Sequence, residues 1–266
     1  MKLDVQGRAA YAYTGGKPFA EDGPCVVFIH GALNDHSVWT LLARWYAHHG
    51  HRVLAVDQPG HGRSDGPPLP SVEALADWVL ALLDAAGVKT AHLVGHSMGS
   101  LIALEAASRA PERAAGLVMV GTAYPMKVSD ALLATARDEP ARAIAMVNAF
   151  SHSGIASKPS YPGPGAWLRG GASALMHRTQ DGAEGNLFEH DFRVCDAYAN
   201  GLQAAARVTC PASLIVGTRD VMTPAKATKE LAGMLDATVS RIVSGHALMQ
   251  EAPDAVLNAM RAAIPA

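Results

Sequence analysis

A serine flanked by glycines lies at the junction of two predicted elements and could act as a nucleophile. Residues 95–99 read Gly-His-Ser-Met-Gly, with Ser97 between the apolar run 90–94 and the alanine-rich stretch 98–109. The run predicts a strand and the stretch predicts a helix, so the serine falls in a nucleophile elbow. Such a turn strains the backbone at the serine and directs backbone N–H groups of the helix N-terminus toward the hydroxyl. The pattern indicates attack on a carbonyl carbon, with the resulting oxyanion held by these N–H groups.

A serine hydroxyl is a poor nucleophile at neutral pH, so a histidine base and an orienting acid are expected elsewhere in the chain. Asp220 follows the apolar run 212–217, and His246 follows the predicted strand 238–243. Together with Ser97 they stand in the chain order serine, acid, histidine. All three follow a predicted strand, and loops at the carboxyl ends of parallel strands meet at one edge of a sheet. The sequence therefore predicts a Ser97–Asp220–His246 catalytic triad.

The elements that must position these residues alternate along the first half of the chain. Predicted strands lie at 25–29, 52–56, 90–94 and 115–120, and predicted helices lie at 37–47, 71–86 and 98–109. This alternation predicts a parallel sheet with helices on both faces. Residues 2–13 predict antiparallel edge strands. The alternation breaks between about 124 and 206, where helical pieces are expected at 130–150, 170–180 and 187–206.

Composition limits the class of protein. The chain has 266 residues, 49% hydrophobic and 17% charged, with a net charge of −2, which suits one large α/β domain. This charge gives no electrostatic argument for binding nucleic acid or an anionic membrane. Three widely spaced cysteines predict no disulfide, and neither a signal peptide nor a run of transmembrane length is found. We therefore expect a cytoplasmic protein, and the sequence does not fix its oligomeric state.

Four segments together resemble the α/β-hydrolase family, in particular its serine esterase and haloperoxidase-like branch with a cap insertion. They are residues 30–31, residues 57–64, the elbow, and residues 245–246 with 251–253 behind them. The resemblance implies an α/β-hydrolase fold, with a mostly parallel eight-stranded sheet and helices on both faces, in a core of residues 1–123 and 207–266. It places a helical cap at residues 124–206, and it assigns the oxyanion-hole N–H groups to Ala32 and Met98.

The type of nucleophile distinguishes branches of this family. Epoxide hydrolases and haloalkane dehalogenases place an aspartate at the elbow, whereas Ser97 favours acyl chemistry. We expect a serine hydrolase, without cofactor or metal, that cleaves a small-to-medium carboxylic ester through an acyl-enzyme. Lactones and thioesters use the same machinery. The alternatives are hydrolysis of a carbon–carbon bond in a β-diketone-like compound, for which Arg169, Arg178 and Arg193 could hold the product, and a non-catalytic small-molecule receptor on the same fold.

The cap is expected to line the acyl pocket with apolar side chains, which suggests an uncharged or weakly polar acyl group. The expected pocket residues are Met126, Met146, Phe150, Trp167, Met176 and Phe188.

Other histidines and acids could compete for the catalytic roles. In the family pattern the rings of His30, His61 and His96 pack or join loops. Residues 48–51 hold three histidines at a predicted helix end, where they interact favourably with the helix dipole, and a metal role is disfavoured. The remaining acids are assigned structural or peripheral places: Asp57 is expected to tie its own loop together, and Asp65, Asp191 and Asp196 are expected to be surface or lid residues.

Overall fold

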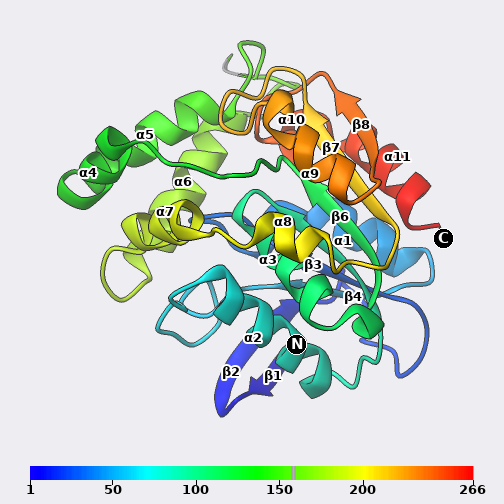
Figure 1. The fold of residues 1–266 in the computed structure, drawn as a ribbon. Helices are drawn as coiled ribbons and strands as arrows, with labels where there is room; N and C mark the ends of the chain where they lie inside the picture. Colours follow the sequence, from blue (N-terminus) through cyan, green and yellow to red (C-terminus); the bar gives the residue numbers. More distant parts are fainter. Residues whose placement is uncertain (157, 159, 266) are drawn as a thin grey trace.

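One twisted sheet organises the chain, as Figure 1 shows. The computed structural model describes residues 1–156, 158 and 160–265. Within them, eight strands form the order β1-β2-β4-β3-β5-β6-β7-β8. Their bounds are β1 Lys2–Val5, β2 Arg8–Tyr13, β3 Cys25–Ile29, β4 Arg52–Val56, β5 Ala91–His96, β6 Ala114–Val120, β7 Ala212–Gly217 and β8 Thr238–Ile242. β1 and β2 pair antiparallel and the other strands run parallel, so the predicted mostly parallel sheet is confirmed.

Helices cover both faces of this sheet because its central strands are apolar on both sides. In β3, Val27 and Ile29 face the core that α2 and α3 cover, while Val26 and Phe28 pack with Trp39 and Tyr46 on the other face. The helices of the core are α1 Thr40–His48, α2 Val72–Ala85, α3 Met98–Arg109, α9 Lys229–Met234, α10 Leu248–Glu251 and α11 Pro253–Ala263, with single turns η1 His36–Trp39, η2 Pro111–Arg113 and η3 Ala225–Thr228. No helix among the described residues combines the length and apolar character needed to cross a bilayer.

A helical segment leaves the sheet after β6 and returns to it at β7. It contains α4 Asp130–Asp138, α5 Pro140–Ser151, α6 Leu168–Asp181, α7 Leu187–Ala197 and α8 Gly201–Ala205, and no strand among its described residues. The single helix expected at 130–150 is divided, because Pro140 begins α5 at a position that needs no N–H. Helices α4 to α7 form their own apolar cluster beside the sheet, whereas Ala204 and Ala205 of α8 pack in the core next to α3 (Figure 1).

The two ends of this helical segment are held together. The Tyr124 hydroxyl donates a hydrogen bond to the carbonyl of Ala199 at 2.6 Å. The N–H of Val128 donates to Asp196 Oδ1 at 3.0 Å. The chain segment that leaves the core and the one that returns to it therefore lie side by side.

Candidate active site

Ser97 lies in a left-handed turn between β5 and α3. Its backbone angles are φ 52° and ψ −122°, which a side-chain-bearing residue rarely adopts. The two glycines of the motif permit this turn for a steric reason. A Cβ on Gly95 would collide with the backbone of Gly99, and a Cβ on Gly99 would collide with the carbonyl oxygens of Ile29 and His30. The start of α3 thus rests directly on the ends of β3 and β5.

The loop after β3 lies against the serine. A Cβ on Gly31 would be 3.0 Å from the Cβ of Ser97, so any larger residue here would crowd the serine. The next residue, Ala32, lines the same cavity as Ser97. Among the described residues, no group accepts a hydrogen bond from the N–H of Ala32 or of Met98. Both N–H groups are therefore available to an oxygen atom bound beside the serine.

Three side chains donate hydrogen bonds to three successive carbonyl groups of this loop. Gln58 Nε2 donates to the carbonyl of His30 at 2.7 Å, and His30 Nδ1 donates to the carbonyl of Gly31 at 2.8 Å. Asn34 Nδ2 donates to the carbonyl of Ala32 at 2.9 Å. These bonds orient the peptide planes on either side of the Ala32 N–H, which is what a preorganised oxyanion donor requires.

Asp220 and His246 form a buried pair. His246 Nδ1 lies 2.8 Å from Asp220 Oδ2, and that oxygen also accepts the Thr223 hydroxyl at 2.7 Å. The N–H groups of Met222 and Thr223 donate to the other oxygen, Oδ1, at 2.8 and 2.9 Å. Burial acts to raise the pKa of Asp220, but His246 and the hydrogen bonds outweigh it and lower the pKa below the ordinary value. The carboxylate is therefore held ionised and fixed in orientation.

Thr223 was not anticipated as part of this pair. Its hydroxyl oxygen is also 3.1 Å from His246 Nδ1, so it contacts both partners. The available signal is its spacing, since it stands three residues after Asp220, within reach of an Asx turn.

His96 connects the elbow to the histidine loop. Its Nε2 donates to the carbonyl of His246 at 3.0 Å, and the two rings lie 4.8 Å apart. Burial, followed by the neighbouring His246, lowers the pKa of His96 to about 3, so the ring is neutral. Within the described residues, Ser97 Oγ and His246 share the cavity wall without a direct hydrogen bond. Such contacts are often long in unliganded enzymes and tighten when substrate binds.

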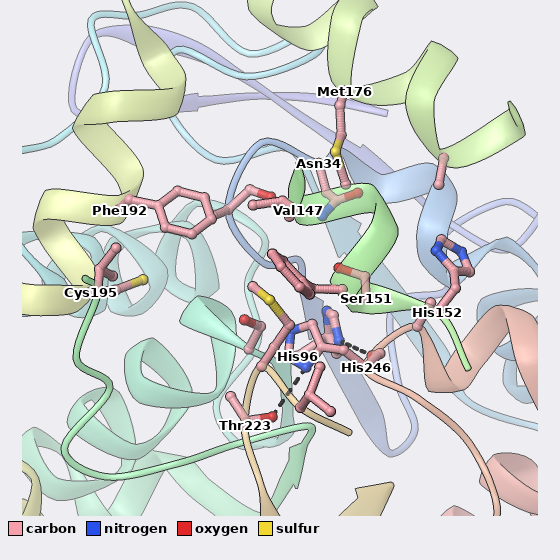
Figure 2. A pocket seen from close by; sticks show the side chains of 18 of the residues that line it. Asn34, His96, Val147, Ser151, His152, Met176, Phe192, Cys195, Thr223 and His246 are labelled. Carbon is pink, nitrogen blue, oxygen red and sulfur yellow. Dashed lines mark hydrogen bonds between the residues drawn. The ribbon is translucent and has the colours of Figure 1, made fainter. Parts of the chain in front are cut away.

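A cavity of about 560 Å³ opens over Ser97 and His246. Figure 2 shows Val147, Met176 and Phe192 on one side of it, with His96 and His246 on the other. Four of the expected pocket residues line this cavity: Met126, Met146, Phe150 and Met176. Apolar residues that the sequence did not single out complete the wall, among them Val147, Phe192, Cys195, Met222 and Met249.

The other two expected pocket residues are not part of this wall. Trp167 is 58% exposed and lies against Gly170 at the start of α6. Phe188 is fully buried inside the helical cluster and stacks on Phe192, with ring centres 4.6 Å apart. Phe192, one turn further along α7, takes the place that we expected for Phe188. Both corrections arise because the sequence does not define how a helix is rotated against its neighbours.

Charged side chains are nearly absent from the cavity. Of the described lining residues, Lys127 alone carries a charged side chain, and its ammonium donates to the carbonyl of Asp196 at 2.7 Å. The cap arginines are engaged elsewhere or lie outside the lining: Arg178 pairs with Asp35 at 2.8 Å, Arg193 pairs with Glu189 at 2.7 Å, and Arg169 is not a lining residue. The described residues that line the cavity include no arginine.

The acids and histidines that could compete for the catalytic roles have structural partners. Asp57 Oδ1 accepts from the N–H and Nδ1 of His36, and Oδ2 accepts from the N–H of Arg63, so it ties its loop together.

In the described chain, one set of side chains has the spacing of a metal site, namely Asp35, His36 and Asp57. Both carboxylates there already accept hydrogen bonds from this protein, and Arg178 adds a cation. The donor set therefore does not favour a metal.

Asp191 corrects an expectation. We expected a surface or lid residue, but it is 2% exposed and contacts the core from α7. Its Oδ2 accepts from His61 Nε2 at 2.9 Å and from the N–H of Leu33 at 2.8 Å. A signal was present in its spacing, because Asp191 lies on the same helical face as the buried Phe188 and Cys195.

Comparison with known proteins agrees with this geometry. Residues 24–160 match the family model described as alpha/beta hydrolase fold. The chain belongs to the α/β-hydrolase family. It is 33% identical to the pimeloyl-(acyl-carrier protein) methyl ester esterase of Chromobacterium violaceum over 244 residues, which cover 88% of this chain and 84% of that protein.

Two further similarities differ in extent. The dihydrolipoyllysine-residue acetyltransferase component of the acetoin cleaving system of Pseudomonas putida is 36% identical over 124 residues. That match covers 46% of this chain and spans about a third (32%) of the length of that relative. The crystal structure of the enol-lactonase from Burkholderia xenovorans LB400 has a TM-score of 0.85 at 22% identity, covering 100% of both chains, and shows the shared fold.

The close packing at the elbow predicts a steric cost for Gly99→Ala. The added Cβ would press on carbonyl oxygens of the strand β3 end, so we expect a loss of about 3 kcal/mol in the free energy of unfolding. The matched control is Gly233→Ala in α9, where the Cβ meets no atom within 4 Å. We expect that variant to be unchanged or about 0.5 kcal/mol more stable. Urea unfolding of both variants measures the difference, and equal stabilities would contradict the packing described.

The environment of His96 predicts a ring that does not titrate near neutral pH. Because its pKa lies at about 3, the ring should remain neutral from pH 5 to pH 8, with the proton on Nε2. Long-range nitrogen–proton NMR spectra report the tautomer, and loss of the signal in His96→Asn assigns it. A ring that takes up a proton between pH 5 and 8 would show that the site is more solvated than its burial indicates.

Proposed function

We propose that this α/β-hydrolase cleaves small-to-medium carboxylic esters through an acyl-enzyme on Ser97. The observation that carries the proposal is the 2.8 Å contact between Asp220 and His246 at the cavity into which the strained elbow presents Ser97. A neutral cavity of about 560 Å³ above them suits an acyl group of modest size.

In the proposed reaction, His246 Nε2 takes the proton from Ser97 Oγ as the oxygen attacks the ester carbonyl. The bond between the carbonyl carbon and the alcohol oxygen then breaks, and His246 gives that proton to the departing oxygen. The acyl group remains bound to Ser97 Oγ. Water then attacks the acyl-enzyme, with His246 acting as base a second time, and the acid is released. Asp220 stays ionised throughout and holds the imidazole with its proton on Nδ1.

The N–H groups of Ala32 and Met98 are the proposed donors to the oxyanion. Their lack of protein partners among the described residues supports this role, as does the network that fixes the loop carbonyls. The start of α3 adds the positive end of its helix dipole. Preorganised donors of this kind contribute about 10²–10³ each to kcat in other serine hydrolases.

Several features support an ester with an uncharged acyl group. The wall is apolar, and the one lining ammonium group is bound to Asp196. The relatives named above include a methyl ester esterase and an enol-lactonase, both of which act on an ester bond. The absence of an arginine among the described lining residues gives no support to a carbon–carbon hydrolase with an anionic product.

Residues 124–206 are proposed to act as a cap on a core formed by residues 1–123 and 207–266. Helices α4, α5, α6 and α7 contribute much of the cavity wall, which supports this division. A cap of this kind excludes water and selects the acyl group.

The proposed nucleophile predicts the effect of Ser97→Ala. With p-nitrophenyl acetate, butyrate and octanoate, we expect saturable turnover by the natural enzyme and a loss on the order of 10⁶ in kcat in the variant, as for the catalytic serine of subtilisin, which has an unrelated fold. A fluorophosphonate probe should label Ser97, as read by peptide mass spectrometry. Labelling without ester turnover would direct attention to carbon–carbon substrates. Neither labelling nor turnover would favour a receptor that does not catalyse.

The neutral cavity predicts discrimination against a charged acyl group. The p-nitrophenyl esters of butyrate and of succinate have four-carbon acyl chains, and the second ends in a carboxylate. Because the cavity offers no free cation for that carboxylate among its described lining residues, we expect kcat/KM to fall at least ~10-fold for the succinate ester. Initial rates corrected for spontaneous hydrolysis of each ester test this. Equal values would require Lys127 to turn toward the substrate.

A further inference from the structure

Leu33 connects the oxyanion loop to the helical segment in two ways. Its side chain is 1% exposed and packs in the apolar cluster of that segment, beside residues such as Ile144 and Phe188. Its N–H donates to Asp191 Oδ2 at 2.8 Å. The backbone of Leu33 is left-handed, with φ 54°, a conformation that a leucine adopts only when its surroundings impose it. The residue directly before it is Ala32.

His61 contacts the same carboxylate oxygen of Asp191 as the Leu33 N–H does. Its Nε2 lies 2.9 Å from Asp191 Oδ2, and its Nδ1 lies 3.1 Å from the carbonyl of Pro59. Since both ring nitrogens face acceptors, the protonated imidazolium satisfies both contacts. Burial acts to lower the pKa of His61, but the charge and hydrogen bond of Asp191 outweigh it and raise the pKa. Asp191 thus sits in a buried ion pair that restricts its position.

We propose that Asp191 is a positioning residue for the oxyanion hole: it fixes Leu33 from helix α7, and so aims the N–H of Ala32 at the site beside Ser97. This inference rests on the proposed function, because it assigns Ala32 as an oxyanion donor. Asn34 holds the carbonyl of Ala32, and Asp191 holds the next N–H along the chain. Both contacts hold the peptide group that directly follows Ala32, one from the loop itself and one from α7, while His30 holds the carbonyl of Gly31 in the peptide group that carries the Ala32 N–H.

The same turn of α7 also faces the acyl group. Phe192 and Cys195 follow Asp191 on this helix and line the cavity. A substrate that displaces this wall would move Asp191, and with it the loop that carries Ala32.

The test compares Asp191→Ala and Asp191→Asn with the control Tyr198→Phe. Tyr198 follows α7 directly, and its hydroxyl donates to the buried Glu105 at 2.7 Å, so the control also removes a buried contact between this segment and the core. The substrate is p-nitrophenyl butyrate. The second probe is butylboronic acid, whose tetrahedral adduct with Ser97 places an oxygen in the oxyanion hole.

For Asp191→Ala we expect kcat to fall about 30- to 100-fold with KM within about 3-fold, because a misplaced donor affects the transition state rather than substrate binding. The inhibition constant of the boronic acid should rise by a similar factor. In Asp191→Asn an amide oxygen still accepts the Leu33 N–H, so both effects should shrink to about 3- to 10-fold. Tyr198→Phe should lower stability without changing kcat or the inhibition constant.

Unchanged kcat and boronic acid binding in Asp191→Asn and Asp191→Ala would overturn the inference, as would equal effects of the control. If Asp191→Ala does not fold, the matched change in Asp191→Asn decides the question alone. Amide hydrogen exchange at Leu33 is a readout independent of catalysis and should accelerate in Asp191→Ala, and less in Asp191→Asn, which keeps an acceptor for this N–H. Failure of the proposed function would instead appear as absent labelling of Ser97 in the natural protein, with the exchange result unaffected.

Discussion

The close approach of three backbones at the elbow is the constraint on which the site depends. Helix α3 begins in contact with the carbonyl ends of β3, and this contact is possible because Gly95 and Gly99 lack side chains. The serine is left at the junction with a left-handed backbone, and the loop after β3 is brought against it. In the proposed reaction, main-chain N–H groups of these two turns stabilise the oxyanion.

The buried histidines of this sheet edge differ in charge because their partners differ. His96 and His30 are buried among few acceptors, and burial lowers the pKa of His96 to about 3 and of His30 to about 4. His61 faces Asp191, and its pKa is raised despite its burial. His96 and His30 therefore act as neutral hydrogen-bond donors, whereas His61 is the imidazolium that pairs with Asp191. His246 is paired with Asp220. The local partner, rather than burial alone, decides the state of each ring.

Much of the core could be predicted from the sequence because its signals are local. The strands are short apolar runs, and the elbow, the loop at Asp57 and the predicted site residues Asp220 and His246 stand at strand ends, where the topology of a parallel sheet collects them. The cavity wall was predicted less well. Trp167 and Phe188 were expected there, but the rotation of α6 and α7 is set by packing between helices far apart in sequence. Asp191 was misplaced for the same reason, since its partners are 130 and 158 residues away.

The joined ends of the helical segment have an evolutionary consequence. Because Tyr124 is bonded to Ala199 and Val128 to Asp196, the segment departs and returns through one narrow neck. Strands β6 and β7, which precede and follow the segment in the chain, pair directly with each other in the sheet. Changes to the helices beyond the neck would therefore alter the cavity wall without requiring a change in the register of these two strands. The hydrogen bond from the Leu33 N–H to Asp191 limits such changes, because an altered segment must still supply an acceptor for that N–H.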